Sequence, residues 1–167
     1  MIIRVFEPKD STNEINEVLL HLFKNVTIET DYMAQGEIEN IDTLNKVLQN
    51  KNLIHFFGYE DNTPVAYCQV IYKAESTNFI SGAKINALSV LPEKRGQGLG
   101  KELLQEVIST LSKNPKIKNI YLDVVKNNTV AISLYKEVGF EKVGELRNLF
   151  TKDSSLMDIE MYSLLVN

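Results

Sequence analysis

Hydrophobic and polar positions follow two different periods along this chain, and together these periods predict a mixed α/β domain. Runs rich in β-branched residues or with alternating polarity are typical of strands, and they lie at residues 2–7, 53–59, 64–72, 79–90, 117–125, 140–150 and 156–166. Between them, apolar residues three and four positions apart predict four helices. The order predicts antiparallel strands first and parallel β-α-β units later, in a single domain over residues 1–167.

The four expected helices have recognisable ends. The first follows an N-cap at Ser11 or Thr12, and the second follows one at Asp42 or Thr43. The fourth ends at Gly139, which suits a helix C-terminus. The third carries an apolar stripe made of Leu99, Leu103, Leu104, Val107 and Leu111. In the strands, residues 60–63 predict a hairpin turn, and Gly82 is the expected site of a β-bulge.

One junction between a strand and a helix carries an unusual glycine pattern. Gly96, Gly98 and Gly100 alternate there, with Arg95 and Lys101 on either side. A helix start presents unpaired N–H groups and the positive end of the helix dipole, and glycines let that backbone approach a phosphate closely. The stretch is therefore either a pyrophosphate cradle or a glycine-rich turn without a ligand. Its spacing fits neither the dinucleotide-binding pattern nor the P-loop pattern.

The glycine stretch resembles a signature for acetyl-CoA. Arg95, Gly98 and Gly100 satisfy R/Q-x-x-G-x-G/A, a pattern of the GNAT N-acetyltransferase superfamily. A second pattern of that family, roughly N-x-x-A-x-x-x-Y-x-x-x-G-F, is matched without a gap at Asn128, Ala131, Tyr135, Gly139 and Phe140. Two motifs in the right order make the resemblance specific, and it covers residues 54–165.

The resemblance implies a fold and an activity. The GNAT fold has a mixed central sheet with antiparallel N-terminal strands, a parallel β-α-β core and flanking helices. The implied activity is that of an N-acetyltransferase, which moves an acetyl group from acetyl-CoA to a primary amine of a small molecule by direct attack. Two alternatives stay open, namely an enzyme that acetylates protein N-termini or lysines, and a non-catalytic acyl-CoA-binding module.

The resemblance also implies roles for individual residues. The backbone N–H of Leu88 would polarise the thioester carbonyl, the backbone of Val90 would pair with the pantetheine arm, and Tyr135 would protonate the departing thiolate. The structural alternatives are ordinary core-strand residues and a helix tyrosine that packs on the sheet. Asn128 is either a helix N-cap or a pantetheine contact. The expected cofactor-binding positions are Leu88, Val90, Arg95, Gly96, Gln97, Gly98, Leu99, Gly100, Lys101, Asn128, Ala131 and Tyr135.

The sequence leaves the base and the acceptor open. Some GNAT members carry an acidic residue on the strand before the cradle, whereas residues 85–90 contain no carboxylate. This departure favours a water-relayed route for the proton of the amine. Glu29, Asp31 and Glu37 lie in the loop where the family binds its acceptor, and they either attract a cationic amine or form a solvated acidic loop.

Composition argues against several other classes of protein. The net charge of −4 disfavours a nucleic-acid-binding protein. No apolar run is long enough for a membrane helix, and the residues after Met1 predict a strand rather than a signal peptide. His21 and His55 have no partners at metal-ligand spacing, so no metal site is expected. The single Cys68 predicts a buried residue in a reducing, cytoplasmic protein, for which a homodimer is left open.

Overall fold

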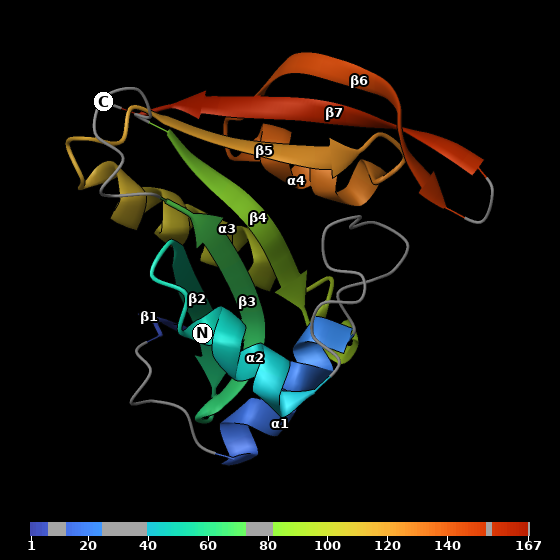
Figure 1. The fold of residues 1–167 in the computed structure, drawn as a ribbon. Coiled ribbons are helices and arrows are strands. Elements are labelled where there is room, and N and C mark those ends of the chain that lie inside the picture. Colours follow the sequence, from blue (N-terminus) through green and yellow to red (C-terminus); the bar gives the residue numbers. More distant parts are fainter. Residues whose placement is uncertain (7–12, 25–39, 73–81, 153–154, 167) are drawn as a thin grey trace.

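The computed structural model describes residues 1–6, 13–24, 40–72, 82–152 and 155–166, without the side chains of residues 13–15, 23–24 and 150–152. Within these ranges, seven strands form one mixed sheet (Figure 1). Its order is β1 (Ile2–Val5), β2 (Leu53–Glu60), β3 (Thr63–Ile71), β4 (Gly82–Val90), β5 (Asn119–Val125), β7 (Ser155–Leu165) and β6 (Glu141–Lys152). The pairing of β4 with β5 is parallel, and the other neighbouring pairs are antiparallel. The predicted fold class is confirmed.

Helices cover both faces of the sheet (Figure 1). One face carries α1 (Asn13–Lys24) and α2 (Ile41–Leu48), whose leucines share an apolar cluster with Phe57 and Tyr67. The other face carries α3 (Leu99–Ser112) and α4 (Thr129–Glu137), which contribute to a second cluster around Cys68. Burial raises the pKa of the Cys68 thiol, so this residue is a small core side chain, as expected.

The helix ends agree with the expectations at α4 and differ from them at α2. Asn128 Oδ1 accepts a hydrogen bond from the Ala131 N–H at 3.1 Å, so Asn128 is the N-cap of α4. The N-cap of α2 is Asn40, whose Oδ1 accepts from the Thr43 N–H at 3.0 Å. Asp42 and Thr43 therefore lie in the first turn of the helix, where the negative charge of Asp42 suits the dipole. The expected caps of α1 lie outside the described residues.

Two irregularities shape the strands. Asp61 and Asn62 both have positive φ, +46° and +63°, as a two-residue hairpin loop requires, and they join β2 to β3 where a turn was predicted. Gly82 pairs in register with Asn119 of β5, so the expected bulge is absent on that side, and residue 73, which would face Gly82 on the β3 side, lies outside the described residues. The extra residue of β4 is Asn86, since consecutive residues of β3 face its neighbours Ala87 and Ile85.

The strands β4 and β5 pair over only part of their length. Residues 82–85 of β4 pair with residues 119–122 of β5, and beyond this point the two strands diverge (Figure 1). Residues 86–90 of β4 therefore have no β5 neighbour on that side, while residues 87–90 still pair with β3. This divergence opens a wedge in the middle of the sheet. No helix in the described part of the chain has the length and apolar character needed to cross a membrane.

Candidate active site

The wedge between β4 and β5 forms a cleft of about 720 Å³. Its walls are residues 85–90 of β4, the glycine loop with the start of α3, residues 123–124 of β5, and one side of α4. Both sequence motifs therefore contribute to a single cavity, although more than 25 residues of the chain separate them. A cavity of this size suits a small-molecule ligand or cofactor.

The backbone of β4 presents an open edge to this cleft. The Leu91 N–H donates to Val65 O at 3.0 Å, so the pair they form is a hydrogen-bonded pair of the β3–β4 ladder. Because such pairs alternate in an antiparallel ladder, the backbone groups of Leu88 and Val90 point away from β3. Their side chains contact the apolar cluster beneath α3, so both residues are core-strand residues with an open backbone edge. The Val90 carbonyl accepts from Arg95 Nε at 3.0 Å.

The glycine loop leaves room where a phosphate would lie. Gly96 and Gly98 have φ of +74° and +82°, and a Cβ on either would meet no atom within 4 Å. Gly98 is also the N-cap of α3, where it offers no side chain to the first-turn N–H groups. A Cβ on Gly100 would touch Val90 and Leu134 at 3.6 and 3.7 Å. The loop therefore fits a pyrophosphate held by backbone amides.

The cationic side chains beside the loop have partners within the protein. Lys101 Nζ donates to Glu137 Oε1, which connects α3 to α4. Lys94 also lines the cleft, and its hydrogen bond to Glu60 at 2.6 Å raises its pKa. Gln97 Nε2 donates to the backbone of Glu93, and Gln97 is not part of the cleft wall. The positive charge expected of Lys101 is thus shared with a carboxylate.

Three predicted residues of α4 lie on the cleft side of that helix. Asn128, Ala131 and Tyr135 are three and four positions apart, which places them on one face. The Tyr135 side chain is mostly buried, with 8% of its surface exposed, and its ring contacts Phe140 edge-on with 6.0 Å between centroids. Packing therefore holds the ring in the cleft wall.

The cleft also contains polar residues that the sequence analysis did not select. Within the described residues, two buried side-chain oxygens lack a hydrogen-bond partner, Asn86 Oδ1 and Ser89 Oγ, and both residues line the cleft. Asp123 lines it from β5, and its carboxylate forms an ion pair with Lys84. A polar residue inside the apolar run 85–90 was the available signal for Asn86.

The expected acceptor-binding residues stay predictions. Glu29, Asp31 and Glu37 all lie outside the described residues. The cofactor contacts expected of Leu88, Val90, the glycine loop and α4 also stay predictions, and the geometry of the cleft is compatible with them.

Comparison with known proteins identifies the family. The acetyltransferase (GNAT) family matches residues 20–140 of this chain. The chain belongs to the GNAT family. A spermine/spermidine N(1)-acetyltransferase of Bacillus subtilis (strain 168) is 46% identical over 121 residues, which cover 69% of this chain and 80% of that protein. The chain is therefore an acetyl-CoA-dependent GNAT N-acetyltransferase, as the two motifs implied.

Solved structures show the same fold at low sequence identity. A ribosomal-protein-alanine N-acetyltransferase from Brucella melitensis superposes with a TM-score of 0.82 at 19% identity, covering 99% of this chain and 100% of that one. A Salmonella typhimurium protein solved with its cofactor acetyl-CoA has a TM-score of 0.80 at 17% identity, covering 100% and 94% of the two chains. These likenesses establish the GNAT fold of this chain.

Proposed function

We propose that this GNAT enzyme acetylates a primary amine of a small polyamine, such as spermine or spermidine. The observation that carries the proposal is that Tyr135 and the open backbone edge of β4 line the same cleft. The acceptor class is supported by the 46% identical relative, which is named as a spermine/spermidine N(1)-acetyltransferase and of which this chain covers 80%.

The backbone would hold and activate the acetyl donor. Bound acetyl-CoA supplies a thioester carbonyl for attack by the amine. The amides of residues 96–101 would hold its pyrophosphate, and the open edge at Leu88 and Val90 would run along its pantetheine arm. The Leu88 N–H would donate to the carbonyl oxygen as negative charge develops there, a kind of donor that contributes about 10²–10³-fold to the rate.

Tyr135 would provide the proton for the departing thiolate. A phenol with an ordinary pKa of about 10 stays protonated at neutral pH, so it can donate a hydrogen bond to the sulfur as negative charge develops there. Full proton transfer to a thiolate whose conjugate acid has a pKa of about 8.5 is uphill by about 1.5 pKa units, or about 2 kcal/mol, which is small beside a reaction barrier. The helix α4 places the phenol in the cleft wall, where its ring is held against Phe140. The amine proton would leave through water, since residues 85–90 contain no carboxylate and Asp123 is engaged by Lys84.

The test of this mechanism is Tyr135→Phe. The variant keeps the ring and its contact with Phe140, so acetyl-CoA affinity and melting temperature should change little. Loss of the acid should lower kcat by about 10²–10³-fold, the lower part of the range for a positioned acid or base. Steady-state kinetics with spermidine, calorimetric titration of acetyl-CoA and thermal melting give the three quantities. A kcat within about twofold of wild type, well below that range, would remove Tyr135 from the mechanism.

A second acceptor class has support from another relative. An N-alpha-acetyltransferase of Sulfurisphaera tokodaii is 34% identical over 73 residues, which cover 42% of this chain and 44% of that protein. Spermidine and a short peptide with a free α-amino group should therefore be compared in the same assay, by the rate of CoA-thiol release. A larger kcat/KM for spermidine is expected, and a larger value for the peptide would overturn the proposed acceptor class.

A further inference from the structure

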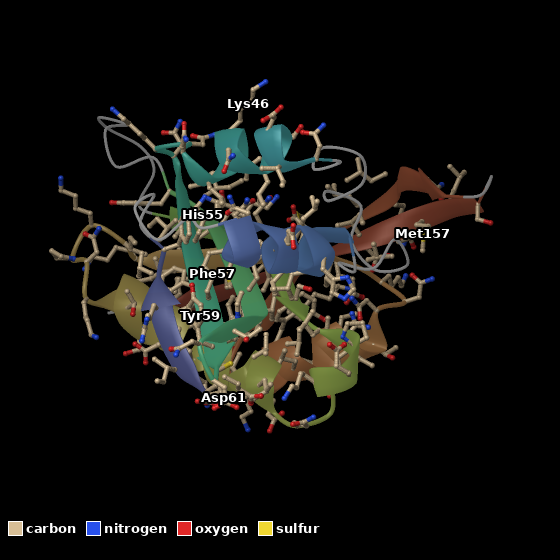
Figure 2. All side chains as sticks on the ribbon, turned by 90° about the horizontal axis from the view of Figure 1, so that it is seen from below. Lys46, His55, Phe57, Tyr59, Asp61 and Met157 are labelled. Atoms are coloured by element: carbon tan, nitrogen blue, oxygen red, sulfur yellow. The ribbon has the colours of Figure 1, made fainter. Side chains whose placement is uncertain are left out.

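A series of buried and partly buried hydrogen bonds runs from α2 through the sheet to the cleft. His55 on β2 lies beside α2 (Figure 2), and its Nε2 is 3.2 Å from the backbone carbonyl of Val47. Its Nδ1 is 2.8 Å from the Tyr67 hydroxyl on β3. Gln69 Nε2 is 3.1 Å from that hydroxyl, and Asn86 Nδ2 is 2.7 Å from Gln69 Oε1. This series of hydrogen bonds therefore links α2, β2, β3 and β4 through four side chains.

The donor and the acceptor of each hydrogen bond in this series follow from the atoms involved. A carbonyl oxygen can only accept, so His55 must carry its proton on Nε2. Burial lowers the pKa of His55 from 6.5 to about 4, so the ring is neutral and its Nδ1 accepts from the Tyr67 hydroxyl. The hydroxyl has then used its proton and must accept from the Gln69 amide nitrogen, which leaves Gln69 Oε1 to accept from Asn86.

These hydrogen-bond directions determine the orientation of the Asn86 amide. Its nitrogen is committed to Gln69, so its oxygen is the atom left over, and this Oδ1 is buried without a partner in a residue that lines the cleft. A buried unpaired acceptor costs about 1–3 kcal/mol, so a native protein that retains one usually has a use for it. Asn86 is also the bulged residue of β4, and a bulge re-aims a side chain.

We propose that Asn86 Oδ1 accepts a hydrogen bond from the acceptor amine, and that Tyr67 is a positioning residue which holds this oxygen toward the cleft through Gln69. This inference deepens the proposed function, because it concerns the amine acetylated in the same cleft. An asparagine amide can present either an acceptor or donors, and only the acceptor orientation suits an ammonium or amine group. The hydrogen bonds disfavour the orientation in which the Asn86 amide would present its nitrogen to the cleft. The amide is therefore preorganised to bind an amine.

Three variants test the coupling between Tyr67 and Asn86. Asn86→Ala should lower kcat/KM for spermidine about tenfold, the effect of one hydrogen bond to a charged donor, with an unchanged KM for acetyl-CoA. Tyr67→Phe keeps the ring but frees Gln69, and it should produce a similar loss. In the Asn86→Ala background, Tyr67→Phe should cause no further loss, because the hydroxyl acts only through the amide. Additive losses would show that Tyr67 acts by another route.

Three further variants separate positioning from stability. Tyr162→Phe is the matched control, since its buried hydroxyl donates to Glu160 at 2.8 Å and takes no part in the chain to Asn86. It should lower the melting temperature as Tyr67→Phe does while leaving kcat/KM unchanged. Asn86→Asp carries two acceptor oxygens and needs no fixed orientation, so in its background Tyr67→Phe should not change kcat/KM. A tenfold loss in that background would overturn the positioning role.

A measurement on the protein without an amine tests the coupling between Tyr67 and Asn86 independently of the acceptor class. Exchange of the Asn86 side-chain amide protons with solvent can be followed by NMR in the protein without amine. Tyr67→Phe should accelerate this exchange several-fold, whereas Tyr162→Phe should not. If wild-type enzyme fails to acetylate spermidine, the proposed acceptor is wrong and the NMR comparison still decides the coupling. Unchanged exchange in Tyr67→Phe would overturn it.

Discussion

Burial of His55 predicts a loss of stability in mild acid. In the folded protein the pKa of His55 falls from 6.5 to about 4, because burial disfavours the charged ring. Between these two pH values the unfolded chain binds a proton that the folded protein does not bind. Stability from this group is therefore complete above pH 6.5 and is lost progressively as the pH falls toward about 4.

The size of the stability loss follows from the shift in the pKa of His55. Each pKa unit corresponds to about 1.4 kcal/mol, so the full loss would be about 3 kcal/mol. Most of it, about 2 kcal/mol, should appear between about pH 7 and about pH 5. Urea unfolding at these two pH values gives the free energy of unfolding and its slope, and an unchanged slope excludes a change in the unfolded state.

The control is a variant without the buried ring. In His55→Gln the loss between the two pH values should shrink by about 2 kcal/mol, although the variant starts from a lower stability because the Tyr67 hydroxyl loses its acceptor. If His55→Gln loses as much stability as wild type does, another group titrates and the reasoning about His55 is refuted. The carboxyl of Glu145, whose pKa falls to about 2 through hydrogen bonds to Lys142 and Lys126, acts only at lower pH.

Two other perturbations test the site and the fold. Gly98→Ala should weaken acetyl-CoA binding in calorimetric titration, and it should lower stability by about 1–2 kcal/mol because Gly98 has a positive φ. Gly139→Ala carries the same backbone strain at the end of α4, so it should lose stability with unchanged acetyl-CoA affinity, and equal affinities in both variants would contradict the cradle. Asn40→Ala should lower the free energy of unfolding by about 1 kcal/mol, since it removes the N-cap bond to Thr43. Asp42→Ala leaves that bond in place, and a larger loss there would contradict the assignment of the cap.

Local patterns explain what could be predicted from the sequence. The five apolar residues expected on α3 are all buried, because a period of 3.6 residues is a property of the helix itself. The hairpin at Asp61 and Asn62 depends on four consecutive residues and was also predicted correctly. The α2 cap was misplaced because Asn40, Asp42 and Thr43 are all suitable cap residues within four positions, and the sequence alone does not rank them.

The features that escaped prediction depend on residues far apart in the chain. The bulge at Asn86 is defined only by the register of β4 against β3, which lies more than fifteen residues away. The hydrogen bonds from His55 to Asn86 cross three strands, so no spacing in the sequence reveals them. The pairing of Lys84 with Asp123 likewise requires knowledge that β4 and β5 are neighbours. The sequence motifs therefore predicted residues of the cleft wall, whereas the additional polar groups of the cleft could be found only in the tertiary structure.

The divergence of β4 and β5 has a consequence for self-association. An unpaired strand edge is a template for strands of other molecules, and proteins usually blunt it with charges, prolines or bulges. Here the unpaired edge of residues 86–90 lies in the interior of the sheet, between β5 and the helices α3 and α4. A second copy of the protein cannot bring a whole sheet to that position, whereas a single extended chain of narrow cross-section can enter. The fold therefore leaves the unpaired backbone edge accessible to a narrow, extended ligand. At the same time it disfavours aggregation through that edge.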